Sequence, residues 1–414
     1  MGETAAAGTI MTVRGPIAPE QLGVCMAHEH LLIDTWNMWP VPNYSLIVDD
    51  VDLLVEEVQR YRDAGGLSLV DMTNIGIGRD PLALRRISEA TGVQVVMGCG
   101  WYRERVYPAY IQEMNATELA ALLVAEIING VDGAGIRPGV IGEIGTERKF
   151  ISPAQERVFR AVARAHLQTG APIATHTTHW GELGLEQLDL LAEEGVDPRH
   201  VIVGHLGDRR GIDIVLPIAE RGAFLSIDNI GYHDYQREEQ RAQNVIDLIR
   251  AGFRGQILLS MDICTLSDLH WYGGKGFDYL LLRFIPLLRQ LGASDDDIHA
   301  MLVENPRRAL VFAESRSRGV VSRTRDGKTA RRQDGKNDDN RGDSQQPVAL
   351  SAPPAQQLIE ADGDHDQQTL DDLLVDGVDA EQVEAVADHR QDQHAEHSPP
   401  DGPLTTHDAG AADD

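Results

Sequence analysis

Short apolar runs alternate with amphipathic helical patterns along residues 1–314. There are eight such runs of five to nine residues, a length that suits buried strands. They are GVCMA (23–27), LSLVDMTN (67–74), VQVVMGCG (93–100), GVIGEIGT (139–146), PIATHTT (172–178), VIVGHLG (201–207), AFLSIDNIG (223–231) and ILLSMDI (257–263). Because most of them are apolar without alternation, they predict strands buried on both faces.

The segments between these runs carry helix signals. After the first run, apolar residues recur at helical spacing until the pattern stops at Gly65-Gly66, a typical helix end. Asp80 and Ser152 each precede a proline, as N-cap residues often do. Gln155 lies where a capping box with Ser152 requires it. Helices are therefore expected between the strands.

Eight buried strands, each followed by a helix, predict an α/β fold of the (β/α)8 TIM-barrel type, which needs about 250 residues or somewhat more. A doubly wound open sheet is the alternative. It is less favoured because no GxGxxG motif follows the first run, as a dinucleotide-binding fold would need. We therefore expect one barrel domain in residues 1–314.

The composition changes abruptly near Glu314. Phe, Tyr and Trp are absent after this residue, and a basic stretch is followed by an acidic one. Such a segment buries too little apolar area to offset the entropy lost on ordering. We expect residues 315–414 to form a disordered tail. It could be an interaction arm, a solvated tail without function or a coding artefact.

The formal net charge of −28 argues against a nucleic-acid partner. Much of this charge lies in the tail, because from Asp343 onward there are eighteen acidic residues and one Arg. Three Cys residues without CxxC spacing suit a reducing compartment. The N-terminal segment lacks a signal-peptide pattern, and no apolar stretch approaches eighteen residues. These features predict a soluble, cytoplasmic protein without membrane contact.

Candidate chemistry collects at the predicted strand ends, where a TIM barrel carries its functional side chains. Any one polar residue at a strand end can be structural, but here six potential metal ligands fall at five ends. They are His28, His30, Glu143, His176, His205 and Asp262. This recurrence predicts a metal site.

The first pair shows the geometry that the motif implies. Side chains two residues apart on a strand point to one face, so His28 and His30 can share an ion while Glu29 points outward. His176 and His205 come from consecutive strands and would supply a second pair. We therefore expect two metal ions.

The ligand types limit the metal and the reaction. Imidazoles and carboxylates suit Zn²⁺, or else Mn²⁺, Co²⁺ or Fe²⁺, better than Ca²⁺ or Mg²⁺. Glu143 could bridge the two ions, which would yield hydroxide near neutral pH and polarise the bond under attack. Asp262 could carry the proton to the leaving group. The pattern predicts a hydrolase that acts on a small molecule.

The motifs AHEHLLID, GEIGT, THT, VGHLGD and LSMDI, in this order and spacing, resemble the phosphotriesterase-related family of the amidohydrolase superfamily. The resemblance covers roughly residues 8–314. It implies that His28, His30 and Asp262 bind the more buried metal, with Asp262 also the catalytic acid and base. It further implies that His176 and His205 bind the more exposed metal, and it leads us to expect a homodimer.

Two departures bear on the substrate. The organophosphate- and lactone-hydrolysing members bridge their metals with a carboxylated Lys, whereas Glu143 resembles the branch of the phosphotriesterase homology proteins. Asn229 stands where the efficient phosphotriesterases have a relay His after the seventh strand, so the resemblance implies an incomplete proton relay, and Asn229 is also a candidate for substrate contact. The resemblance therefore implies a small ester, lactone or amide, with a phosphotriester or phosphodiester as the alternative. A metal-binding scaffold without turnover is the alternative of another class.

Further residues after the third and fourth strands are candidates for substrate contact. Trp101 and Tyr102 could contact the substrate beside the metals or simply pack, as large aromatic residues mostly do. Arg103, Arg105 and Arg148 could hold an anionic group, although a solvated surface role is the alternative for each.

Overall fold

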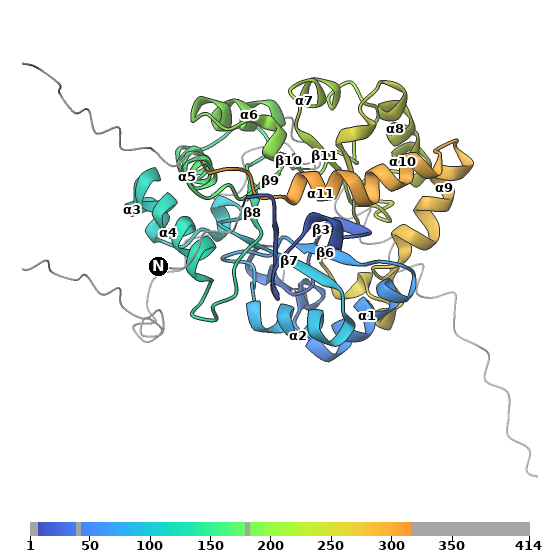
Figure 1. The fold of residues 1–414 in the computed structure, drawn as a ribbon, viewed down its shortest axis with the longest axis horizontal. Coiled ribbons are helices and arrows are strands. Elements are labelled where there is room, and N and C mark those ends of the chain that lie inside the picture. The colour runs from blue at the N-terminus through green and yellow to red at the C-terminus, as the bar shows by residue number, and fades with distance from the viewer. Residues whose placement is uncertain (1–6, 39–42, 179–182, 316–414) are drawn as a thin grey trace, which may run out of the picture. The chain divides into compact units, whose positions relative to one another are not determined.

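A computed structural model describes residues 7–38, 43–178 and 183–315, and its central feature is an eight-stranded parallel barrel sheet (Figure 1). Each of the eight predicted runs overlaps one strand. These strands are β3 (Cys25–Glu29), β6 (Ser68–Asp71), β7 (Gln94–Cys99), β8 (Val140–Gly145), β9 (Ile173–His176), β10 (Val201–Val203), β11 (Phe224–Ile227) and β12 (Ile257–Leu259). Neighbouring strands follow one another in chain order, which confirms the predicted TIM barrel. Residues 316–414 of the predicted tail lie outside the described residues.

The first and last strands close the barrel through the segments that follow them. The backbone N–H of Asp262 donates to the carbonyl of His28 at 3.1 Å. The N–H of His30 donates to the carbonyl of Ile263 at 3.2 Å. Closure therefore brings the HxH pair of the first strand directly beside Asp262, although more than 230 residues separate them in sequence.

Helices surround the strands, as the amphipathic patterns predict (Figure 1). The longer ones are α1 (Val51–Asp63), α2 (Pro81–Thr91), α4 (Ala116–Asn129), α5 (Pro153–Thr169), α6 (Gly184–Glu193) and α8 (Glu238–Arg250). The shorter ones are α3 (Tyr110–Glu113), α7 (Leu216–Glu220), α9 (Ile285–Gln290), α10 (Asp295–His299) and α11 (Asn305–Leu310). None of the helices in the described ranges combines the length and the apolar character that crossing a bilayer requires.

Two predicted helix starts can be checked atom by atom. Asp80 caps α2 by accepting hydrogen bonds from the N–H groups of Leu82 and Ala83. Ser152 and Gln155 form the predicted capping box at the start of α5. Both helices begin at the predicted proline. Local capping chemistry therefore positions these helices after their strands.

Two short antiparallel pairs were not predicted. β1 (Ile10–Thr12) pairs with β2 (Gly15–Ile17), and β4 (Ile33–Asp34) pairs with β5 (Ile47–Val48). Strands of two or three residues give too little alternation to be recognised in the sequence. The β4–β5 pair follows the HxH motif, so it belongs to a loop at the C-terminal end of the barrel.

Glu29, between the two histidines, points away from them as expected, yet it is completely buried. Its carboxylate accepts hydrogen bonds from the N–H groups of Met261 and Ile263 at 2.7 and 3.0 Å, and Oε1 lies 2.7 Å from Ser260 Oγ. Glu29 thus ties β3 to the segment that carries Asp262.

Replacing Glu29 with Gln is expected to lower the free energy of unfolding by about 3 kcal/mol, because an amide NH₂ would face backbone N–H donors. Urea unfolding monitored by circular dichroism measures this loss. Glu56→Gln is the matched control, since Glu56 is exposed on α1. Equal stability losses in the two variants would contradict this role of Glu29.

Candidate metal centre

The structure brings all six predicted ligands together at the C-terminal end of the barrel, and all six are buried. The Glu143 carboxylate lies at the centre of the cluster. Its Oε2 is 3.3 Å from His28 Nε2, 3.0 Å from His176 Nδ1 and 3.3 Å from His205 Nε2. Its Oε1 is 3.3 Å from His30 Nε2. One carboxylate therefore contacts four imidazoles.

Asp262 contacts the same group of histidines. Its Oδ1 lies 3.4 Å from His30 Nε2 and 3.6 Å from His28 Nε2, and its Oδ2 lies 3.7 Å from His205 Nδ1. Two sets of three residues hold donor atoms within 4.8 Å of one another: His28, His30 and Asp262, and His28, Glu143 and His205. The first set is the one that the family resemblance assigned to the more buried metal.

The predicted ligands lie at or near strand ends, but two of them lie beyond the last residue of their strand. His205 and Asp262 do not end their strands but follow Val203 and Leu259 by two and three residues. Both adopt left-handed backbone conformations, with φ of 59° and 55°, and so does Asn229 at 58°. This conformation cannot continue a strand, and residues other than Gly that adopt it are concentrated at functional sites.

A hydrogen bond fixes the tautomer of His30. Thr73 Oγ1 lies 2.7 Å from the carbonyl of Leu32 and 2.8 Å from Nδ1 of His30. Because the carbonyl can only accept, the Thr73 proton points to Leu32 and Nδ1 of His30 carries the other proton. In the neutral form of His30 the lone pair therefore lies on Nε2, which faces the carboxylates.

Asp228 fixes the tautomer of His205 in the same way. It is not among the residues predicted from the sequence. Its Oδ1 lies 3.1 Å from Nδ1 of His205, and its Oδ2 accepts the backbone N–H of His205 at 3.0 Å. Asp228 directly follows β11, so the rule that functional side chains follow strand ends could have found it. Such an outer carboxylate orients an imidazole ligand and makes it more basic.

The arrangement fits divalent metal ions. The buried Nε2 of His28 has no hydrogen-bond partner among the described residues. Nε2 of His205 and Nδ1 of His176 lie 2.6 Å apart, where they can share no more than one proton. Ring nitrogens of four imidazoles thus converge with two carboxylates, which is the donor set that Zn²⁺ and similar metals prefer.

Burial and charge shift the pKa values of the histidines in this cluster in opposite directions. Burial disfavours the charged form of His30, but hydrogen bonds to Asp262 and Glu143 outweigh burial and raise the pKa of His30 to about 10. Burial and the neighbouring His205 lower the pKa of His176 to about 3. His176 is therefore a neutral donor at physiological pH, as a metal ligand must be.

A cavity of about 450 Å³ opens onto the cluster. Its wall is partly apolar and partly aromatic, with two predicted residues, Tyr102 and Asn229, among those lining it. The Tyr102 hydroxyl lies 3.4 Å from both ring nitrogens of His176. Tyr102 therefore lies at the cavity wall, and its contact with a substrate stays a prediction.

Trp101, for which the sequence left substrate contact and packing open, is not among the residues that line this cavity. Its side chain is 1% exposed, lies in the hydrophobic core and donates its indole N–H to the hydroxyl of Tyr110 at 2.8 Å. Its backbone makes an isolated parallel bridge to Ile75, outside the named strands. The packing alternative describes Trp101.

Asn229 lines the cavity but offers no titratable group for a proton relay. Its amide Nδ2 donates to Asp208 at 2.8 Å, and Asp208 also forms a buried ion pair with Arg241 at 2.9 Å. The guanidinium therefore neutralises the carboxylate to which a relay would deliver the proton. This arrangement agrees with the expectation that the relay is incomplete.

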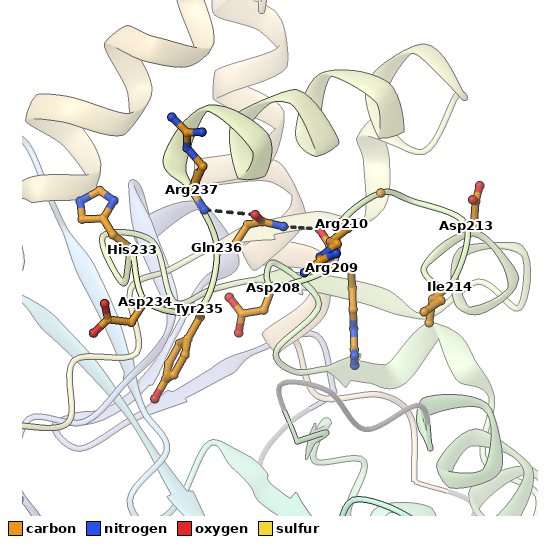
Figure 2. A pocket seen from close by; sticks show the side chains of 11 residues that line it. Asp208, Arg209, Arg210, Asp213, Ile214, His233, Asp234, Tyr235, Gln236 and Arg237 are labelled. Carbon is orange, nitrogen blue, oxygen red and sulfur yellow. Dashed lines mark hydrogen bonds between the residues drawn. The ribbon is translucent and has the colours of Figure 1, made fainter. Parts of the chain in front are cut away.

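A larger cavity of about 760 Å³ lies between the loops after β10 and β11, and it shares Tyr235 with the metal-centre cavity. Figure 2 shows Arg209 and Arg210 on one side and His233 and Asp234 on the other. None of the six predicted ligands lines it. The smaller cavity is therefore the candidate active site.

A model of the phosphotriesterase family matches residues 8–310. The chain belongs to the phosphotriesterase family. The match confirms the resemblance inferred from the five motifs and covers nearly the whole barrel domain. Solved structures of the amidohydrolase type are among those that resemble this chain.

Three relatives illustrate the family. The phosphotriesterase homology protein of Escherichia coli (strain K12) is 39% identical over 69% of this chain and 96% of its own length. Its crystal structure with phosphate in the active site has a TM-score of 0.67 at 38% identity, covering 70% of this chain and 98% of that one. The N-acetyltaurine hydrolase of Danio rerio is 32% identical over 74% of this chain and 98% of its own length. A lactonase of Listeria monocytogenes has a TM-score of 0.68 at 29% identity, covering 74% of this chain and all of that one.

These relatives share the fold and the family with this chain, and two of them are named as hydrolases. The phosphotriesterase-family chain is accordingly a hydrolytic enzyme, as its sequence predicts. Its substrate is a separate question, because members of one family carry different specificities on the same barrel.

Proposed function

We propose that this phosphotriesterase-family enzyme hydrolyses a small ester, lactone or amide with two divalent metal ions, most simply Zn²⁺. The observation that carries the proposal is the single Glu143 carboxylate in contact with four imidazoles, with Asp262 beside them. The residues that would hold the metals are His28, His30, Glu143, His176, His205 and Asp262. When bound, such ions lower the pKa of water and polarise a carbonyl or phosphoryl oxygen.

Asp262 is the residue placed to move the proton. Its side chain reaches both the buried cluster and the cavity wall. Burial raises the pKa of Asp262, but hydrogen bonding to His30 and the charges of His28 and His205 outweigh it and lower the pKa. The ionised carboxylate accepts a proton from the attacking water and delivers it to the leaving group.

The cavity wall supports a carbonyl substrate with an apolar part. Ile33, Met38, Leu46 and Ile77 line the cavity together with Tyr102, whose hydroxyl would donate its proton to a substrate oxygen. The names of two relatives, an N-acetyltaurine hydrolase and a lactonase, describe attack on an amide and on a cyclic ester. An acyl compound small enough for about 450 Å³ is the proposed substrate.

A phosphotriester or phosphodiester is the second candidate substrate. The structure of the E. coli relative holds phosphate in its active site, which favours this candidate. Glu143 in place of a carboxylated Lys, and Asn229 in place of a relay His, count against efficient phosphotriester hydrolysis.

A substrate panel on metal-reconstituted protein tests the proposal. We expect kcat/KM for at least one of a lactone, an N-acyl amino acid and an aryl ester to exceed that for a paraoxon-like triester by about tenfold or more, a difference of roughly 1.4 kcal/mol in transition-state stabilisation. The reverse order would support the phosphoester alternative. A protein that binds metal yet hydrolyses none of these compounds would support the scaffold alternative.

A further inference from the structure

The three arginines that follow the third and fourth strands differ in exposure and in whether they line the candidate active site. Arg105 and Arg148 are exposed and do not line the candidate active site. Arg103 lines it, and no other Lys or Arg does so among the described residues. A single fixed cation therefore stands in the wall of the substrate cavity.

Arg103 lies directly against the metal centre. A Cβ atom at Gly145 would come within 2.6 Å of Arg103 Cγ and 3.3 Å of His176 Cδ2, so both side chains pack over the same glycine. The guanidinium carbon lies 5.9 Å from the centre of the Tyr102 ring. Because Gly145 has no side chain, Arg103 can occupy the space next to a predicted metal ligand.

The guanidinium keeps donors for a ligand. Its Nη2 forms an ion pair with Glu147, which holds the planar group in one orientation. Its buried Nε has no hydrogen-bond partner among the described residues. An Arg side chain has five N–H donors in a fixed fork, so an ion pair at one end leaves others for a second anion. At 25% exposure its charge is only partly screened by solvent.

We propose that Arg103 selects substrates that carry a carboxylate or sulfonate a few bonds from the scissile carbonyl. This inference rests on the proposed hydrolysis of small acyl compounds and names their class: short anionic amides or esters. Arg103 binds the anionic group while the acyl carbonyl lies at the metal centre. The apolar residues Ile33 and Leu46 contact the rest of the molecule. The amide named in the N-acetyltaurine hydrolases carries a sulfonate and belongs to this class.

Matched substrates and matched variants test the proposal. The substrates are N-acetyltaurine, N-acetyl-β-alanine and the neutral N-acetylethanolamine, which have similar lengths. We expect the wild-type protein to prefer an anionic compound in kcat/KM by about 10- to 100-fold, the range for a charge-assisted hydrogen bond. Comparing the sulfonate with the carboxylate decides which anion is favoured.

Arg103→Gln is expected to lose this preference, mainly through a higher KM. Arg105→Gln removes the same charge two positions away on the surface and is expected to keep it. Arg103→Lys retains the charge without the fork and should retain part of the preference. It also covers the case in which Arg103→Gln folds poorly. A wild-type preference that survives unchanged in Arg103→Gln, or no preference in the wild type, would overturn the proposal.

Binding separates this inference from the proposed function. Calorimetry with metal-loaded protein uses the ketone analogues of the same three compounds, in which CH₂ replaces the amide NH. These analogues cannot be hydrolysed. Tighter binding of the anionic ketones to the wild type and to Arg105→Gln, but not to Arg103→Gln, supports the role of Arg103 even if no amide is cleaved. Equal binding of anionic and neutral ketones by the wild type counts against Arg103, whatever the hydrolysis results.

Discussion

Removing divalent metal with a chelator is expected to abolish hydrolysis by this protein, and adding Zn²⁺ back should restore it. The reason is the convergence of four imidazoles on the Glu143 carboxylate, an arrangement that leaves the buried Nε2 of His28 without a hydrogen bond among the described residues. Metal analysis of the purified protein should find about two equivalents, as a binuclear site requires.

Glu143→Ala tests the same centre by removing a protein ligand instead of the metal. Because Glu143 contacts donors of both proposed metal groups, the variant is expected to bind about one equivalent of metal or less and to lose about 1,000-fold or more in kcat/KM. Glu113→Ala, an exposed substitution on α3, is the control and should keep both properties. Metal-dependent hydrolysis would be contradicted if the purified protein held well under one equivalent of metal and its activity survived both the chelator and Glu143→Ala.

Asp262→Asn is expected to lower kcat by about 10²- to 10⁴-fold, the range for loss of a general acid or base. Asn has nearly the shape of Asp and keeps one oxygen for the contacts with His28 and His30, but it cannot accept and return a proton. The pKa of Asp262 is lowered in the folded protein, so the wild-type carboxylate is ionised at neutral pH. The loss should therefore appear at neutral pH.

Metal content distinguishes this effect from simple disruption of the site. Asp262→Asn should retain at least one equivalent of metal, since Glu143 and the histidines remain. Asp49→Asn changes an exposed carboxylate just before α1 and serves as the control, with kcat expected at the wild-type value. If Asp262→Asn kept kcat within about tenfold of the wild type, Asp262 could not be the proton carrier.

Much of the fold and of the candidate site could be predicted from the sequence because both depend on local patterns. Strand-length apolar runs and amphipathic stretches predict the order of elements, and parallel strands bring all their C-terminal ends to one side of a barrel. His28, Glu143 and Asp262 needed only a place at those ends to be recognised as neighbours. Because parallel strands end on one side of the barrel, the structure brings all six predicted ligands together.

Residues that act through the ligands could not be predicted, because their roles depend on contacts between distant segments. Thr73 fixes the tautomer of His30, and Glu29 holds the segment around Asp262. The sequence shows these side chains but not their partners, which come from other strands. Asp228 was within reach of the strand-end rule, yet only the structure shows that it contacts His205.

The sequence by itself determined the barrel, the family and the set of groups that can bind metal, since these follow from periodicity, order and residue type. Only the tertiary structure decided which neighbours in a loop face the site. Tyr102 lines the cavity while Trp101 packs in the core, and Arg103 lines it while Arg105 is exposed. The physical reason is that the direction of a loop side chain is set by barrel closure and by packing against other segments, which no local pattern encodes.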